Sequence, residues 1–191
     1  MKKLKGIVMS DHSVCKILDG TKTQTRRKIG IRHYVGQELY VKQAFANVSV
    51  GENSFPILRA LGFNDYLRLF RPIDGHYEAN IDGELVSVNR EQIQNQYLKI
   101  RWKQSRFMKA DYARIHLLIT KISYQKLGAI SEDDAKAEGA EPIEGSYIQG
   151  FRDLWERVNG KGTWDPGRDV EVIQFEVLRN NSKTSEWNLD L

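Results

Sequence analysis

The sequence predicts an α+β domain built around a small twisted β-barrel. Three observations support this prediction. The chain has 191 residues, a length that suits one domain. Several short stretches alternate between apolar and polar residues, as strands do. Three other stretches carry an apolar stripe at helical spacing or a capping residue at their start. This mixture of short strands and short helices is typical of the α+β class.

The N-terminal part is expected to form a strand, a helix and a second strand. Residues 4–9 are predicted as the first strand. Residues 10–20, "SDHSVCKILDG", predict a helix because Ser10 or Asp11 can cap its start and Gly20 suits its end. After a basic, threonine-rich segment, residues 35–45, "VGQELYVKQAF", predict a turn and a strand.

Residues 46 to about 98 have a different composition and are predicted as an insertion into a smaller core fold. They are rich in aromatic and mixed charged residues. Within them, "HYEANIDGELVSV" predicts a hairpin, because Asp82-Gly83 stands between two strand-like runs and favours a tight turn.

The C-terminal half is expected to supply a long strand, two helices and a last strand. The long strand, or bent strand pair, is "YARIHLLITKISYQKL". Ser131 and Asp134 approximate a capping box for the first helix, and Gly139 ends it. The second helix, 147–160, has apolar residues every three or four positions. Residues 169–178 alternate as a strand. The prediction is one domain over 1–180, with a loose tail at 181–191.

Composition limits the possible functions. The net charge of +4 permits binding to nucleic acid without requiring it. No apolar run approaches the roughly 18 to 20 residues of a membrane span, so no membrane partner is expected. A single cysteine, Cys15, indicates a reducing, cytoplasmic setting, and is itself expected to be a buried small side chain. His12 and Cys15 have no second ligand pair, so neither a metal nor another cofactor is predicted.

The segment 17–28, "ILDGTKTQTRRK", concentrates hydroxyl groups and cations next to the expected end of a helix. It is either a solvated loop or the wall of a site that binds a polar, anionic group. Arginine forks match phosphate oxygens, so Arg26, Arg27 and Lys28 are candidates for phosphate contacts. The stretch "RWKQSRFMKADY" mixes cations with aromatic rings, which suits single-stranded RNA. The alternative is that Trp102, Phe107 and Met108 belong to the core, and Met108 is expected to do so.

Several blocks in a fixed order give the sequence a resemblance to a known family. The blocks are "ILDGTKTQTRRKI", "VGQELYVKQAF", "RWKQSRFM", "ARIHLLITKI", "ISEDDAKAEGA", "FRDLWERVNGKGTW" and "VEVIQFEVL". Their order resembles that of ASCH-domain proteins, most of all the longer ones carried by phages and prophages. The resemblance implies a PUA-like β-barrel with short helices covering its ends, and a cleft for RNA or modified nucleosides.

The resemblance also implies site residues. One ASCH branch is an amidohydrolase acting on N4-acetylcytidine, with a Lys and a Thr in a "GxKTxTxR" segment and a Glu in a later helix. In "GTKTQTRR" and "AKAEG" these positions are Lys22, Thr25 and Glu138. A hydroxyl beside a lysine of lowered pKa, with a carboxylate to move a proton, suits amide hydrolysis. The other interpretation is a surface ion pair between Lys22 and Glu138.

The chain departs from the family pattern after the basic segment. Where the family often has Gly-Asp-x-Leu-x-Val-Arg-Glu, this chain has "GQELYVKQ", with Gln37 and Gln43 in place of acids and Lys42 in place of an arginine. The loss of the last acid weakens the prediction of chemistry.

Further substrate-binding residues are predicted around this site. They are Thr23, Arg26, Arg27, Tyr40, Lys42, Ser105, Arg106 and Phe107. Trp164 is expected to pack as a staple on the helix before it, rather than to cover the cleft as a lid.

The function predicted from the sequence is recognition of RNA or a modified nucleoside in a basic, hydroxyl-rich cleft. One alternative is an amidohydrolase for N4-acylated cytidine that uses Lys22, Thr25 and Glu138, or another RNA-processing hydrolase. A second alternative is a phage accessory protein whose aromatic insertion binds a host protein. Weak salt dependence would separate chemistry on a neutral nucleoside from RNA binding.

Overall fold

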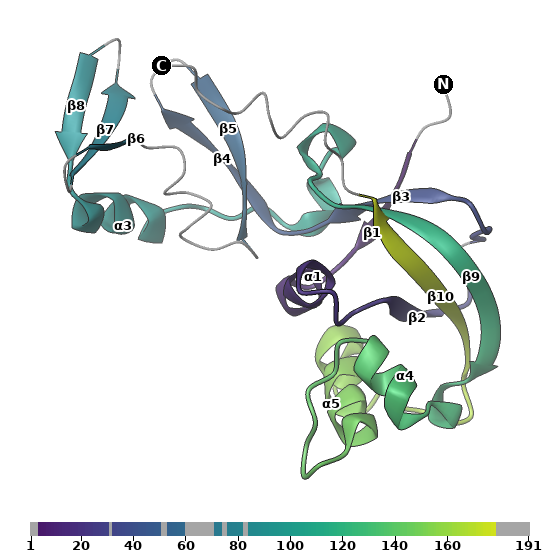
Figure 1. Cartoon of the computed structure of the whole chain (residues 1–191). Helices are drawn as coiled ribbons and strands as arrows, with labels where there is room; N and C mark the ends of the chain where they lie inside the picture. Colours follow the sequence, from purple (N-terminus) through teal and green to yellow (C-terminus); the bar gives the residue numbers. More distant parts are fainter. Residues whose placement is uncertain are drawn as a thin grey trace. The chain divides into compact units, whose positions relative to one another are not determined.

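The computed structural model describes residues 4–30, 32–50, 53–59, 71–73, 76–81 and 84–178. The chain divides into two units, one formed by Met1–Val41 with Ala113–Leu191 and the other by Lys42–Tyr112. Figure 1 shows the elements of both units. The predicted tail at 181–191 and much of the predicted insertion lie outside the described residues.

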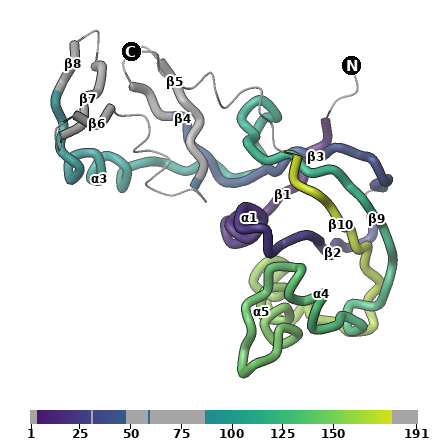
Figure 2. The backbone as a smooth tube through the Cα atoms, in the orientation of Figure 1, coloured from purple at the N-terminus to yellow at the C-terminus, as the bar shows by residue number. Residues whose placement is uncertain are grey.

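The first unit contains a five-stranded sheet in the order β1-β3-β9-β10-β2. The strands are β1 (Lys5–Val8), β2 (Gln24–Lys28), β3 (Glu38–Lys42), β9 (His116–Lys126) and β10 (Asp169–Leu178). Figure 2 traces β2 and β10, which come from opposite ends of the chain and pair antiparallel. The predicted α+β class is confirmed. The predicted closure into a barrel is not seen, because β1 and β2 are the edge strands of the described sheet.

Three predicted helices of this unit are confirmed as α1 (Asp11–Leu18), α4 (Glu132–Ala137) and α5 (Tyr147–Asn159). Each begins after a serine whose side chain accepts a backbone N–H of the first turn, namely Ser10, Ser131 and Ser146. Helices α4 and α5 pack against each other beyond one end of β9 and β10 (Figure 1).

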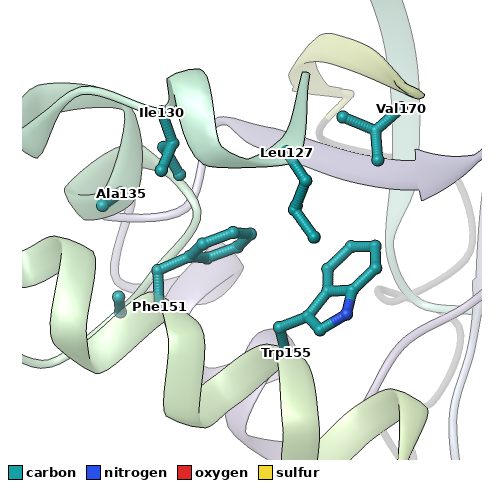
Figure 3. Packing of buried hydrophobic residues seen from close by; sticks show 7 residues of the cluster. Leu127, Ile130, Ala135, Phe151, Trp155 and Val170 are labelled. Carbon is teal, nitrogen blue, oxygen red and sulfur yellow. The ribbon is translucent and has the colours of Figure 1, made fainter. Parts of the chain in front are cut away.

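A compact apolar cluster holds these two helices to the sheet (Figure 3). Its buried members are Leu127, Ile130, Ala135, Ala140, Phe151, Trp155 and Val170. Phe151 and Trp155 project from α5, and Leu127 comes from the 3₁₀ turn η4 (Leu127–Ala129) that follows β9. Trp164 packs against the same cluster, and the centroid of its ring lies 6.1 Å from the ring centroid of Phe151. The predicted staple role of Trp164 is therefore confirmed.

The described part of the second unit contains two small antiparallel sheets and short helices. The strands are β4 (Phe45–Val50), β5 (Asn53–Leu58), β6 (Arg71–Ile73), β7 (His76–Ile81) and β8 (Glu84–Val88). The helical segments are α3 (Arg90–Leu98), η2 (Ser105–Phe107) and η3 (Ala110–Tyr112). The predicted hairpin is confirmed, since β7 pairs with β8 up to Ile81 opposite Glu84. Its two turn residues lie outside the described part of the chain.

One local expectation was wrong, one of two alternatives is excluded, and one expectation was confirmed. Cys15 is exposed rather than buried, because Val14 and Ile17 carry the buried stripe of α1 and position 15 faces away from it. The segment before residue 28 is not a solvated loop, since Gln24–Lys28 form the edge strand β2. Met108 is buried, as predicted.

Candidate functional site

Strand β2 brings polar side chains into the interior of the first unit. Its sequence, QTRRK, has no apolar residue, yet Gln24, Thr25 and Arg26 are all buried. The strand is held by pairing with β10, where Arg26 stands opposite Val172 and Arg27 opposite Glu171. Backbone pairing alone does not satisfy buried cations, so their side chains must find partners within the fold.

The end of α4 supplies the main partner, Glu138. Gly139 has a φ of 78°, which ends the helix in the left-handed conformation that glycine adopts without strain. A Cβ at this position would lie 2.9 Å from Cβ of Lys16 and 3.2 Å from Cβ of Lys22. Thr23 N–H donates to the carbonyl of Ala137 at 2.9 Å. The helix end and the segment before β2 are thus fixed against each other.

One buried carboxylate lies between two cations. Lys22 Nζ donates to Glu138 Oε2 at 3.1 Å and to the Glu138 backbone carbonyl at 2.6 Å. Arg26 Nη1 donates to Glu138 Oε1 at 3.0 Å. The side chains of Lys22 and Glu138 are 3% and 4% exposed, and that of Arg26 is fully buried. The predicted pairing of Lys22 with Glu138 exists, but it is an interior pair and not the surface pair considered as the alternative.

The rest of the Arg26 guanidinium is also occupied. Nη2 donates to Asp134 Oδ2 at 2.8 Å. With the Gln125 amide turned so that its oxygen faces the arginine, that oxygen accepts from Nε at 2.9 Å and from Nη2. The charged group also lies 5.8 Å from the ring centroid of Phe151. Arg26 is therefore a fully satisfied group that ties β2 to α4 and α5.

Burial shifts the proton affinity of two groups at this site. It lowers the pKa of Lys22 below its ordinary value of 10.5, although the Glu138 charge and hydrogen bond oppose the shift. Burial likewise lowers the pKa of Arg27, again against the attraction of Glu138. Both shifts have the same cause, which is the cost of holding a charge away from water.

A pocket of about 80 Å³ opens onto these residues within the first unit. Lys22, Thr25 and Glu138 line it together with Arg26, Arg27 and Lys28. The remaining lining comes from the end of β1 and the residue after it, from the start of α1, and from α5, including Phe151 and Trp155. The three residues named from the family resemblance thus share one pocket, and the catalytic roles given to them stay predictions.

Other predicted binding residues do not line this pocket. Thr23 is exposed next to it, and Tyr40 is buried in β3. In the second unit, Lys42 Nζ donates to the carbonyl of Arg106 at 2.6 Å. The Arg106 guanidinium lies 4.9 Å from the ring of Phe107, which is 62% exposed. Ser105 begins the same 3₁₀ turn. The roles of these residues stay predictions.

The two glutamines that stand where the resembled family pattern has acids have different surroundings. Gln37 is buried, and its side-chain oxygen accepts from Tyr34 N–H at 3.3 Å. Gln43 is completely buried, and neither atom of its amide group has a hydrogen-bond partner among the described residues. A neutral amide at position 43 therefore has no carboxylate function there.

Sequence reasoning missed the groups that support the site. Asp134 was noticed only as a capping residue, yet its side chain binds Arg26 and also accepts from Gln24 Nε2 at 3.1 Å. Gln125 was seen as an ordinary strand residue. The only available signal was the run of polar residues at 22–27, which a buried strand tolerates only with such partners.

Neither a metal-ligand cluster nor a membrane-spanning helix occurs in the described part of the chain. No group of three or more His, Cys, Asp and Glu side chains in that part is placed to hold a metal ion. No described helix is long and apolar enough to cross a membrane.

Comparison with known proteins gave one structural similarity. No family model matches the chain, and no curated protein matches its sequence. The solved structure is described as "High resolution crystal structure of ASCH domain from Lactobacillus crispatus JV V101". It shares 14% identity at a TM-score of 0.39, over 86% of this chain and 69% of that one. A similarity of this size assigns no residue and no role.

Proposed function

We propose that this chain is an ASCH protein, of the longer type carried by phages, that recognises RNA or a modified nucleoside. The pocket between β2, the start of α1 and α5 is the recognition site, and residues 46–98 are an insertion in the family's core domain. The observation that supports the proposal is a pocket wall on which two buried cations, Lys22 and Arg26, are held by Glu138 beside the hydroxyl of Thr25.

The lining suits one part of a nucleotide. A volume of about 80 Å³ is well below the roughly 300 Å³ of a pocket that encloses a drug-sized ligand. The pocket therefore takes a single group, such as a base edge or a phosphate. Thr25 supplies a hydroxyl and Arg27 supplies a guanidinium, while Phe151 and Trp155 add apolar surface. Hydroxyls and guanidinium groups are typical contacts for base edges and phosphates.

The second unit carries a separate surface feature that fits the same ligand class. Phe107 is exposed, and the Arg106 guanidinium stacks over its ring. Exposed aromatic rings next to arginine bind unpaired bases, at about 1 to 3 kcal/mol per base. This unit supports RNA binding independently of the pocket.

Fluorescence anisotropy with a labelled single-stranded RNA tests the proposal. We expect binding that weakens with salt, with log K falling by about 0.7 per log unit of salt for each phosphate contact. Phe107→Ala should weaken binding, while the matched control Tyr124→Ala, an exposed aromatic of the first unit, should not. Absence of binding to RNA and to every nucleoside in a modified-nucleoside panel contradicts the proposal.

Amide hydrolysis is a second candidate because burial lowers the pKa of Lys22 next to Glu138, in the pocket that Thr25 also lines. A neutral Lys22 would take the proton of the Thr25 hydroxyl as its oxygen attacks the amide carbon. The proton then passes to the leaving amine, and water hydrolyses the resulting ester to free acid and threonine.

Incubation with N4-acetylcytidine, followed by mass spectrometry, tests this chemistry. We expect cytidine and acetate from the wild type and neither from Lys22→Ala or Thr25→Val. Arg157→Gln, an exposed change on α5, is the control. A wild type that leaves N4-acetylcytidine and other N4-acylated cytidines intact refutes hydrolysis without affecting the binding proposal.

A further inference from the structure

Two adjacent arginines of β2 have opposite surroundings. Arg26 has partners for all three of its nitrogens, including two carboxylates. Arg27 has no carboxylate within ion-pair distance among the residues that the structure describes. Its Nη2 donates to the carbonyl of Val8 at 2.7 Å and contacts Met9 Sδ at 3.2 Å. The two side chains therefore have different tasks, although the sequence presents them as one basic run.

The Nε atom of Arg27 is a buried donor without a partner. An unpaired buried donor costs free energy, about 1 to 3 kcal/mol and more for a charged group. The lowered pKa of Arg27 has the same origin, since burial disfavours its charge. Most buried polar groups in folded proteins are satisfied, so an orphaned one on a pocket wall points to a missing partner.

The acid that strand pairing places opposite Arg27 is used elsewhere. Glu171 is the cross-strand neighbour of Arg27. Its carboxylate lies 2.7 Å from His33 Nδ1 and accepts from the Tyr124 hydroxyl at 3.4 Å. The other nearby carboxylate, Glu138, is shared by Lys22 and Arg26. Among the described residues, no carboxylate forms an ion pair with Arg27, and only the more distant charge of Glu138 attracts it.

The pocket wall carries an excess of positive charge. Among the described residues, the lining includes the cationic side chains of Lys22, Arg26, Arg27 and Lys28 and the carboxylate of Glu138, while Asp134 pairs with Arg26 from outside the lining. The hydroxyls of Ser10 and Ser13 also line it, at the start of α1. Such a lining favours a group that only accepts hydrogen bonds and carries negative charge.

We propose that Arg27 anchors a phosphoryl oxyanion of the ligand, while Arg26 is a positioning residue that holds Glu138 and β2 in place. This inference rests on the proposed function and narrows it. The pocket binds a phosphate-bearing ligand, either a free nucleotide or the backbone of RNA, in preference to a neutral nucleoside. The unpaired Nε of Arg27 is the donor that such a ligand would engage, since guanidinium N–H groups form strong hydrogen bonds with phosphate oxygens.

Calorimetric titration of matched ligands tests the inference. The ligands are the four nucleosides, their 5′- and 3′-monophosphates, and the corresponding dinucleoside monophosphates with one internal phosphodiester. We expect the wild type to bind phosphate-bearing ligands about 10- to 100-fold more tightly than the parent nucleosides, the range for charge-assisted hydrogen bonds. A preference for monophosphates indicates a free nucleotide, and one for the phosphodiester indicates the RNA backbone.

Variants then assign the preference to one side chain. Arg27→Gln should remove this preference by lowering the affinity for phosphate-bearing ligands to that for nucleosides, and Arg27→Lys should keep only part of the preference, because a lysine has no fork. Arg157→Gln removes the same charge from an exposed position on α5 and should change nothing. Circular dichroism shows whether each variant is folded. The preference of the wild type for phosphate-bearing ligands is measured on the wild type alone, so it tests the inference even if a variant does not fold.

The outcomes distinguish failure of the oxyanion site from failure of the proposed function. Equal affinity of the wild type for nucleosides and nucleotides refutes the oxyanion site and leaves nucleoside recognition standing. A preference that survives in folded Arg27→Gln refutes the role of Arg27. A wild type that binds no RNA, nucleoside or nucleotide refutes the proposed function and the inference together.

Discussion

Replacing Glu138 by glutamine tests the central ion cluster. The change keeps the shape of the side chain and removes its charge. Glu138 accepts two charge-assisted hydrogen bonds, from Lys22 at 3.1 Å and Arg26 at 3.0 Å. Such bonds are worth about 1.5–3 kcal/mol each, and a neutral acceptor keeps about 1 kcal/mol. With about 1 kcal/mol kept in each of the two bonds, the expected loss is about 1–4 kcal/mol, and its upper end reaches the roughly 3–5 kcal/mol cost of breaking a buried ion pair.

Urea denaturation followed by tryptophan fluorescence measures this loss, because Trp155 and Trp164 report on the core beside the site. For a chain of this size, a loss of about 3 kcal/mol lowers the melting temperature by about 6–12 °C. Glu176→Gln removes an exposed carboxylate from β10 and should change stability by less than about 0.5 kcal/mol. If Glu138→Gln also costs less than about 1 kcal/mol, the cluster does not stabilise the fold.

Two further predictions concern the same unit. The pKa of Lys22 is lower in the folded protein than in the unfolded chain, so the unfolded chain binds more protons than the folded protein does as the pH rises. The free energy of unfolding of the wild type, relative to that of Lys22→Met, should therefore rise with pH towards 10.5. Urea titrations between neutral pH and that value measure this difference in stability, and a flat or falling difference would contradict the shift. Leu127→Ala should cost about 2–5 kcal/mol because the side chain is completely buried, whereas Leu18→Ala, at an exposed position, should stay within about 0.5 kcal/mol; similar losses in both variants would contradict the core assignment.

The predicted elements have either a periodic apolar face or a capping or turn residue that marks their ends. Helix α5 and strand β10 were found because a repeat of about four or of two residues records which face is buried. Strand β2 was missed as a strand because its inward side chains are polar and are satisfied by ion pairs instead of apolar contacts. Helix α3 was missed because only Ile93 of its nine residues is buried.

Some residues of the candidate site could be predicted from the sequence, and others could not. Lys22, Thr25 and Glu138 were named through a family resemblance, and nothing in residue spacing alone would have brought position 22 next to position 138. Their supporting partners, Asp134 and Gln125, depend on how α4 and β9 lie against β2, which is a property of the fold and not of any local motif. The sequence also gives no sign that Arg26 is paired with carboxylates while Arg27 is not.

The residues of the central cluster are far apart along the chain. Lys22 and Glu138 are separated by 116 positions, and β2 obtains its strand partner only from β10. During synthesis the N-terminal cations therefore leave the ribosome long before their carboxylate exists. Closing so long a loop is slow, since chain entropy is lost before the contact is gained. Ligand binding is therefore a sign that folding is complete. A nascent chain that ends before residue 138 would have the cations of the pocket but not the carboxylate that holds them. Ligand binding would appear only after β10 has been added.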